Sequence, residues 1–333
     1  MSSLRLSIRA ALLVGLVCAL PTLAGAQALG GVATPFTLSV APNNPVPYGR
    51  VTVTPVPNQI DIANATMTVI VGGKKVASGN AGPATITLGA PGVPVVVVVR
   101  LTSAGGVYTQ QVIITPQGVV LVAEPLSSAP PLYKGKSLVP IGGSVRVVAV
   151  ADMRTTGGKR LDPDTLSYAW TVDDVDFPGA SGIGRKTAII DSPLLYRSQS
   201  VVVTVVSQDG RQAGGASIYL AAADPSVRIY ERDPLLGIRF DHALSSTYVL
   251  QGAEVTLYAG LFSFPTALRA PSLQWFVNGM LAETTNLITL RPTGSGEGTA
   301  SLSANGSSGG EAIASTNLTV SFGSASGGNL FGL

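Results

Sequence analysis

The feature that most constrains this chain is a strand-and-turn pattern that occurs three times. Its clearest copy is SLQWFVNGML (272–281), in which an apolar strand carrying Trp275 runs into an Asn278-Gly279 turn. The same arrangement recurs as LSYAWTVDD around Trp170 and, in weaker form, as TMTVIVGGK around Val69. A short apolar strand followed by a two-residue turn of this kind is a strong hairpin signal. Three copies of one pattern predict three copies of one domain.

The composition favours strands over helices. Only 12% of the 333 residues are charged, whereas Gly and Pro number 39 and 23. β-Branched side chains suit a pleated surface, while Gly and Pro interrupt helices and promote turns. A chain of this length is sufficient for two or three domains of about 100 to 150 residues. We therefore predict an all-β fold with several domains.

Strand-like segments follow the same order in each copy of the pattern. We predict domains at residues 34–115, 117–222 and 224–322, followed by a flexible Gly/Ser-rich tail at 323–333. The order matches a tandem array of three immunoglobulin-like β-sandwiches, in which a large side chain on the third strand fills the space between two sheets. The predicted core residues at that position are Trp170, Trp275 and, in the first repeat, Val69.

Three stretches carry a more specific likeness: PPLYKGKSL, DPDTLSYAW and YERDPLLGIRFDHAL. They resemble segments of uncharacterised exported bacterial proteins built from tandem Ig-like, PKD-like β-sandwich domains. The resemblance extends over all three repeats, and the first repeat departs from it by having Val69 where a Trp is expected. It implies a fold and an exported location, and it implies no activity.

The N-terminus has the pattern of a signal peptide over residues 1–26. Arg5 and Arg9 precede an apolar segment at 10–20, and Ala24-Gly25-Ala26 offers small residues for cleavage before Gln27. The apolar segment is about half as long as a spanning helix requires; an uncleaved anchor is the alternative. We expect an exported protein, secreted, periplasmic or at the cell surface, that meets a membrane only through this segment if it stays uncleaved.

Cleavage after residue 26 would alter the charge and the thiol content. It removes two of the 21 basic residues and none of the 18 acidic ones, so the net charge falls from +3 to +1. That balance gives no reason to expect a nucleic-acid partner. The one cysteine, Cys18, would be lost as well, which excludes disulfides and thiol chemistry from the exported chain.

Each repeat also carries a proline-containing excursion between its first two predicted strands. The excursions read PNNPVPYGR, PPLYKGKSLVPIGG and ERDPLLGIRFDHAL. We predict that they pack against the following domain or a partner and stiffen the array; the alternative is a merely elongated edge loop. The candidate contact residues are Tyr48, Leu132, Tyr133, Leu235, Leu236 and Phe240.

Few residues offer chemistry. Asp173, Asp174 and Asp176 form the densest group of carboxylates and are a candidate calcium site, although their spacing matches no EF-hand. His242 is the sole histidine, which favours a local structural role over a catalytic triad. No cofactor other than calcium is expected.

The function that best fits these observations is non-catalytic. We expect an exported surface protein that serves adhesion, cell-envelope structure or binding of a protein partner. An accessory glycan-binding protein is the alternative, and exposed aromatic side chains outside the strands would support it. A secreted hydrolase is a remote alternative because the sequence contains no recognisable catalytic arrangement.

Overall fold

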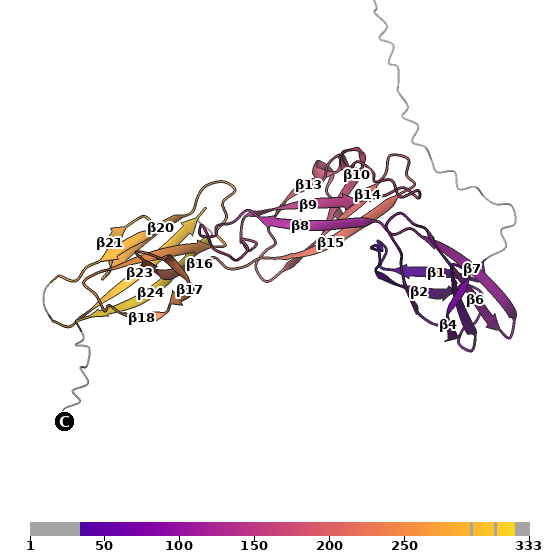
Figure 1. Cartoon of the computed structure of the whole chain (residues 1–333), viewed down its shortest axis with the longest axis horizontal. Coiled ribbons are helices and arrows are strands. Elements are labelled where there is room, and N and C mark those ends of the chain that lie inside the picture. Colours follow the sequence, from indigo (N-terminus) through magenta and orange to yellow (C-terminus); the bar gives the residue numbers. More distant parts are fainter. Residues whose placement is uncertain (1–33, 294–295, 310–311, 324–333) are drawn as a thin grey trace, which may run out of the picture.

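The protein, described here from a computed structural model, consists of three β-sandwiches that follow one another along an elongated array (Figure 1). The structure describes residues 34–293, 296–309 and 312–323. The predicted signal peptide at 1–26 and most of the predicted tail lie outside these residues. Within the described ranges, no helix is long and apolar enough to cross a membrane. The predicted all-β class with tandem immunoglobulin-like sandwiches is confirmed.

The first sandwich pairs a three-stranded sheet with a four-stranded sheet. The smaller sheet has the order β1 (Phe36–Ala41), β2 (Arg50–Pro57), β5 (Ala84–Thr87). The larger has the order β4 (Lys74–Asn80), β3 (Thr66–Val71), β6 (Val95–Ser103), β7 (Gly106–Ile114). Every pair is antiparallel. Strand β4 is the second strand of the hairpin predicted at Gly72-Gly73, and its side chains are mostly polar and exposed, as expected of an edge strand.

The second sandwich repeats this arrangement. Its smaller sheet has the order β13 (Thr187–Asp191), β9 (Ser144–Asp152), β8 (Gly118–Pro125). Its larger sheet has the order β11 (Val175–Asp176), β10 (Ser167–Val172), β14 (Ser198–Val206), β15 (Ala213–Ala221), and β12 (Gly182–Ile183) also pairs with β10. Two 3-10 turns, η1 (Pro163–Thr165) and η2 (Pro178–Ala180), flank β10.

The third sandwich is enlarged by strands that the other two lack. One sheet has the order β17 (Gly237–Leu244), β16 (Ser226–Asp233), β19 (Val255–Phe262), β22 (Leu287–Leu290). The other has the order β18 (Ser246–Val249), β24 (Ala312–Phe322), β23 (Gly298–Ser308), β20 (Ser272–Val277), β21 (Met280–Glu283). Strand β18 runs parallel to β24, and all other pairs are antiparallel.

The third excursion, ERDPLLGIRFDHAL, is predicted as a loop from the sequence, but its second half forms a strand. Residues 237–244 form β17, which pairs with the extended β16 across a bulge between Tyr230 and Arg232. The segment GIRFDHAL has no strict apolar alternation, so its pattern does not indicate a strand. The backbone pairs with the open edge of β16 and adds a fourth strand to that sheet.

The repeated pattern occupies an equivalent place in each sandwich. Gly72-Gly73, Asp173-Asp174 and Asn278-Gly279 each form the turn of a hairpin, and all six residues have positive φ. Two positive φ angles are the requirement of the tight turn that matches the twist of a hairpin. The pattern thus marks one hairpin per sandwich.

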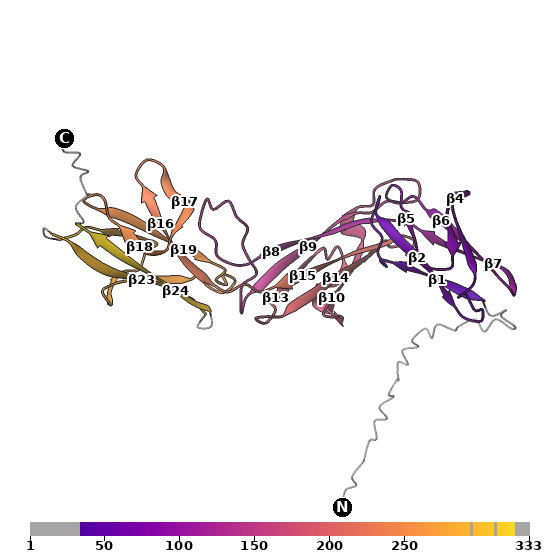
Figure 2. The same ribbon diagram turned by 90° about the horizontal axis from the view of Figure 1, so that it is seen from below.

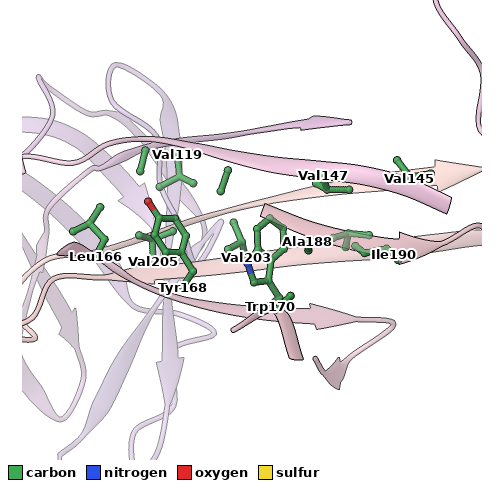
Figure 3. Close-up of a cluster of buried hydrophobic side chains, with 14 of the residues drawn as sticks. Val119, Val145, Val147, Leu166, Tyr168, Trp170, Ala188, Ile190, Val203 and Val205 are labelled. Atoms are coloured by element: carbon green, nitrogen blue, oxygen red, sulfur yellow. The ribbon is translucent and has the colours of Figure 1, made fainter. Parts of the chain in front are cut away.

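Each sandwich has its own apolar core between its two sheets. Val69, Trp170 and Trp275 each belong to one of the three cores, and each is at most 1% exposed. Figure 3 shows Trp170 and Tyr168 pointing into the space between the sheets of the second sandwich. The indole N–H of Trp170 donates to the carbonyl of Arg185 at 2.9 Å, and that of Trp275 donates to the carbonyl of Thr285 at 3.0 Å.

A buried glutamine fixes the start of the second domain, next to its joint with the first. Gln117 lies between β7 and β8 and is 2% exposed. Its side-chain amide donates to Gln212 at 2.6 Å and to the carbonyl of Arg154 at 2.9 Å, and its oxygen accepts from the Arg154 backbone at 2.9 Å. The side chain of Asn44, in the first excursion, lies so close to Gly215 that a Cβ there would stand 2.5 Å from the amide nitrogen. The joint is polar.

Candidate interaction surface

The second excursion forms a loop, here called the strap (residues 129–138), that reaches from the second domain onto the third. The hydroxyl of Ser127 donates to the carbonyl of Leu138 at 2.6 Å and closes the base of the strap. Next to that base the two domains share backbone hydrogen bonds: Ser128 N–H donates to Phe264 at 2.8 Å, and Ser263 N–H donates to Ser128 at 3.0 Å. A further bond runs from Thr266 N–H to the carbonyl of Leu126 at 3.0 Å. Strand-like pairing thus holds the strap at the domain joint.

Phe240 of β17 and the strap together cover the outward face of β16 and β19. Along β16 and β19, Ile229 and Leu257 point into the third core, so Tyr230 and Tyr258 point outward. Yet these two tyrosines are only 3% and 7% exposed. A sheet buried on both faces has nearly continuous apolar strands, and β19 has that pattern.

Five aromatic rings make up the covered layer. This aromatic cluster consists of Tyr133 from the strap and four residues of the third domain: Tyr230, Phe240, Tyr258 and Phe262. Tyr133 meets Phe262 edge to face with ring centroids 5.0 Å apart and Phe240 with centroids 6.0 Å apart. Phe240 in turn meets Tyr230 at 5.1 Å and Tyr258 at 5.9 Å. Edge-to-face pairs at these separations stabilise a contact beyond the area that they bury.

A glycine makes room for the strap above this sheet. A Cβ built on Gly260 would lie 2.9 Å from Cγ of Pro130 and 3.0 Å from a ring carbon of Phe262. Any larger side chain there would push against the strap.

Burial raises the pKa of Tyr230 and of Tyr258 above the ordinary value of 10.0, so both phenols are neutral at physiological pH. The aromatic cluster therefore forms an uncharged packing contact between the strap and the third domain.

The six predicted contact residues divide into two groups. Tyr133 and Phe240 meet each other across the joint of the second and third domains. The other four are exposed to solvent: Tyr48, Leu132, Leu235 and Leu236. The first excursion meets the second domain through Asn44. In the first two excursions one residue thus contacts the following domain, whereas Phe240 of the third excursion meets the preceding domain.

The exposed leucines stand at the tips of two neighbouring loops. Leu132, 93% exposed, is in the strap, and Leu235 and Leu236, 94% and 77% exposed, form the turn between β16 and β17. We call these three residues the leucine tips. Figure 2 shows the strap and the β16–β17 hairpin projecting from the same side of the molecule. The Asp233 carboxylate accepts from the N–H groups of Leu235 at 2.7 Å and Leu236 at 2.9 Å, which braces the hairpin tip.

The predicted calcium ligands do not converge. Asp173 and Asp174 form the turn between β10 and β11, and a carboxylate oxygen of Asp173 accepts from the backbone N–H of Ser200 at 2.8 Å. Asp176 lies on β11. In the part of the chain that the structure describes, no three Asp, Glu, His or Cys side chains are grouped so as to hold a metal ion. The calcium hypothesis has no geometric support here.

His242 lies on β17 and is exposed. Its neighbour Asp241 forms an ion pair with Arg239 at 3.3 Å, so that carboxylate is already engaged. The structure therefore places His242 on a strand and not in the loop where the sequence suggested it.

No protein-family model matches the chain, and no curated protein is similar to it in sequence. Solved structures similar to it include a central fibronectin-III array of RIM-binding protein, at 12% identity and a TM-score of 0.29, covering 84% of this chain and 93% of that one. Three N-terminal domains of the bacteriophage RB49 highly immunogenic outer capsid protein match at 12% identity and a TM-score of 0.25, covering 86% and 98%. Sidekick-1 immunoglobulin domains 1–5 match at 13% identity and a TM-score of 0.30, covering 86% and 59%. Likenesses of this strength add no argument about function.

Proposed function

We propose that this chain is a non-catalytic, exported array of immunoglobulin-like domains that binds a protein or cell-envelope partner through the leucine tips. One observation carries the proposal: three large apolar side chains are exposed on two adjacent, braced loops at one joint. Apolar side chains gathered on a surface are typical of a contact with another macromolecule. Loops that are already ordered lose little conformational entropy when they bind.

The strap gives these tips a firm base. Tyr133, next to Leu132, is held between Phe240 and Phe262, and Phe240 belongs to the strand that follows the hairpin tip. The aromatic cluster therefore positions both loops relative to each other. Adhesion and envelope structure both require a surface that is held in place under load, which is what such packing supplies.

The test is a binding measurement with matched variants. The exported chain, beginning at residue 27, would be immobilised and exposed to envelope fragments from its native cells, and captured components would be identified by cross-linking. We expect the Leu132→Ser/Leu235→Ser/Leu236→Ser variant to lose about tenfold or more in affinity. The control is Leu194→Ser/Leu268→Ser/Met280→Ser, whose three residues are also exposed. Equal binding by both variants would refute the proposal.

A glycan-binding role is the second candidate. Tyr48 and Tyr196 are exposed and lie outside the strands, and stacking on such tyrosines is a common way to hold a sugar ring. A glycan array probed with the exported chain distinguishes the two. Glycan binding that is lost in Tyr48→Ala or Tyr196→Ala, and retained in the triple leucine-to-serine variant, would favour the glycan-binding role.

A further inference from the structure

The third core is open at the end of its sandwich that points away from the second domain (Figure 1). A cavity of about 220 Å³ lies there, here called the end cavity. It is lined by two buried core residues, Leu250 and Val320, and by three partly buried ones, Val277, Leu290 and Phe322. The last three are the final residues of β20, β22 and β24. The strand ends therefore leave an apolar opening into the core.

The one charge on the lining of the end cavity is already paired. Among the described residues that line it, Arg291 alone is ionisable, and its guanidinium forms an ion pair with the carboxylate of Glu254. Pro292, Thr293 and Ala300 complete the lining. The end cavity therefore favours an uncharged, apolar occupant.

The corresponding end of each of the other two sandwiches lies against the following domain. In the first sandwich, a Cβ on Gly92, in the loop after β5, would lie 2.6 Å from the carbonyl oxygen of Thr155 in the second domain. In the second sandwich, a Cβ on Gly143, just before β9, would lie 3.0 Å from Cβ of Pro265 in the third domain. In the third sandwich, the segment that follows β24 at this end is SASGGNLFGL (324–333).

The sequence of that segment divides into a linker and an apolar anchor. Residues 324–328 are all Ser, Ala or Gly, a composition typical of linkers. Leu330 and Phe331, here called the apolar anchor, follow after Asn329. Two adjacent large apolar side chains gain free energy when they leave water. The segment thus carries side chains of the kind that the end cavity favours.

We propose that the apolar anchor occupies the end cavity of its own third sandwich and closes the core there. An apolar cavity of about 150 Å³ is large enough to hold a benzene molecule, so the end cavity has room for the ring of Phe331. The anchor is also within reach. Eight residues lead from Gly323 to Phe331, and a linker of that length spans about 16 Å on average. Its starting point is at the cavity, because Phe322 is part of the lining.

Two features favour the anchor of the same chain over that of a second copy. A short linker keeps the anchor at an effective concentration on the order of millimolar, far above that of other copies in a dilute solution. Gly323 has a φ of +72°, so the chain leaves its extended course directly after β24, as a segment that folds back requires. The contact involves neither the strap nor the leucine tips and is therefore independent of the proposed function.

Disulfide trapping tests the proposal. The chain from residue 27 onward contains no cysteine, so an introduced pair has no competitor. Thr293→Cys places a thiol on an exposed residue of the cavity lining, and Gly332→Cys places one beside the anchor. The control pairs Gly332→Cys with Thr299→Cys. Thr299 is also exposed, but it precedes Ala300 on β23 and so points to the opposite face of the sheet. We expect the first pair to form an intrachain disulfide about tenfold faster than the control.

Removal of the anchor should abolish this difference. Adding Leu330→Ser/Phe331→Ser to the first pair should lower its rate to that of the control pair. Equal rates for the two original pairs, or a rate that the serine changes leave unaltered, would overturn the proposal. Disulfides that form between chains, seen as dimers on a non-reducing gel, would show that the occupant is a second copy and would overturn it as well.

Methyl NMR of the chain without introduced cysteines gives a second test. Leu330→Ser/Phe331→Ser should shift the methyl signals of Leu290 and Val320, which line the end cavity. The methyl signals of Val203, in the core of the second sandwich, should stay in place. Unchanged signals from Leu290 and Val320 would contradict an anchor in the cavity.

Discussion

The ring of Tyr133, in the strap of the second domain, meets the ring of Phe262, in β19 of the third domain, edge to face with centroids 5.0 Å apart. This pair is the point at which a loop of one sandwich becomes part of the packing of the next. Through Phe240, on β17, the contact continues to Tyr230 and Tyr258, which are buried on the outward face of β16 and β19. The second and third domains therefore share a layer of side chains.

Replacing the strap tyrosine should uncouple these two domains. Tyr133→Ala removes two aromatic contacts, so we expect the third domain to lose roughly 1 to 3 kcal/mol of unfolding free energy. Chemical denaturation of the chain from residue 27 onward, followed by tyrosine and tryptophan fluorescence, measures this. Leu132→Ala is the control: its side chain is exposed and should change stability by less than about 0.5 kcal/mol. Equal losses in the two variants would count against a coupling role for Tyr133.

Filling the space at Gly260 should lift the strap. A Cβ there would lie 2.9 Å from Pro130, so Gly260→Ala is expected to displace the strap and to speed tryptic cleavage after Lys134 and Lys136 several-fold. Gly79→Ala, also on a strand, meets no atom within 4 Å and is the matched control. An unchanged cleavage rate in Gly260→Ala would show that the strap does not rest on that residue.

The indole hydrogen bond of Trp275 should stabilise the third core. Trp275→Phe leaves the carbonyl of Thr285 without its donor and leaves a void between the sheets, so we expect a loss of roughly 2 to 4 kcal/mol. Differential scanning calorimetry should show the third domain melting earlier while the first two keep their transitions. A uniform shift of all transitions would contradict independent cores.

The hairpin tip should loosen in acid. The backbone N–H groups of Leu236 and Leu235 hold the pKa of Asp233 below its ordinary value of 3.8. Because the folded pKa is lowered, the bracing is fully present above pH 3.8 and is lost as the pH falls through the lowered value. The protection factors of the Leu235 and Leu236 amides, their exchange rates relative to an unstructured amide at the same pH, should fall in that range, and Asp233→Ala should show low protection at all pH values. Slow exchange in Asp233→Ala would mean that other contacts hold the tip.

Sequence patterns predict the repeated hairpins well because their causes are local. The turn at Asn278-Gly279 requires two positive φ angles, which these residues adopt at little cost, and the preceding strand alternates in and out of the core. The same local logic applies to Gly72-Gly73. Strand β17 has no such signal, since it forms by pairing with the edge of β16 and not through its own alternation. Backbone pairing of that kind depends on which edge the fold leaves open.

By itself the sequence determined the number of sandwiches, the order of most strands and the inward direction of Trp170 and Trp275, because alternation and turn chemistry act within a few residues. The tertiary structure alone decided which outward faces are covered. Tyr230 on β16 and Val150 on β9 are both apolar residues at outward positions of equivalent sheets. Tyr230 is buried because the rings of Phe240 on β17 and Phe262 on β19 pack against it, whereas Val150 is exposed because no segment of the described chain covers it. The pairing of β17 with β16, and the contact of Phe240 with Tyr133 about a hundred positions away, make that difference, and no local pattern encodes them.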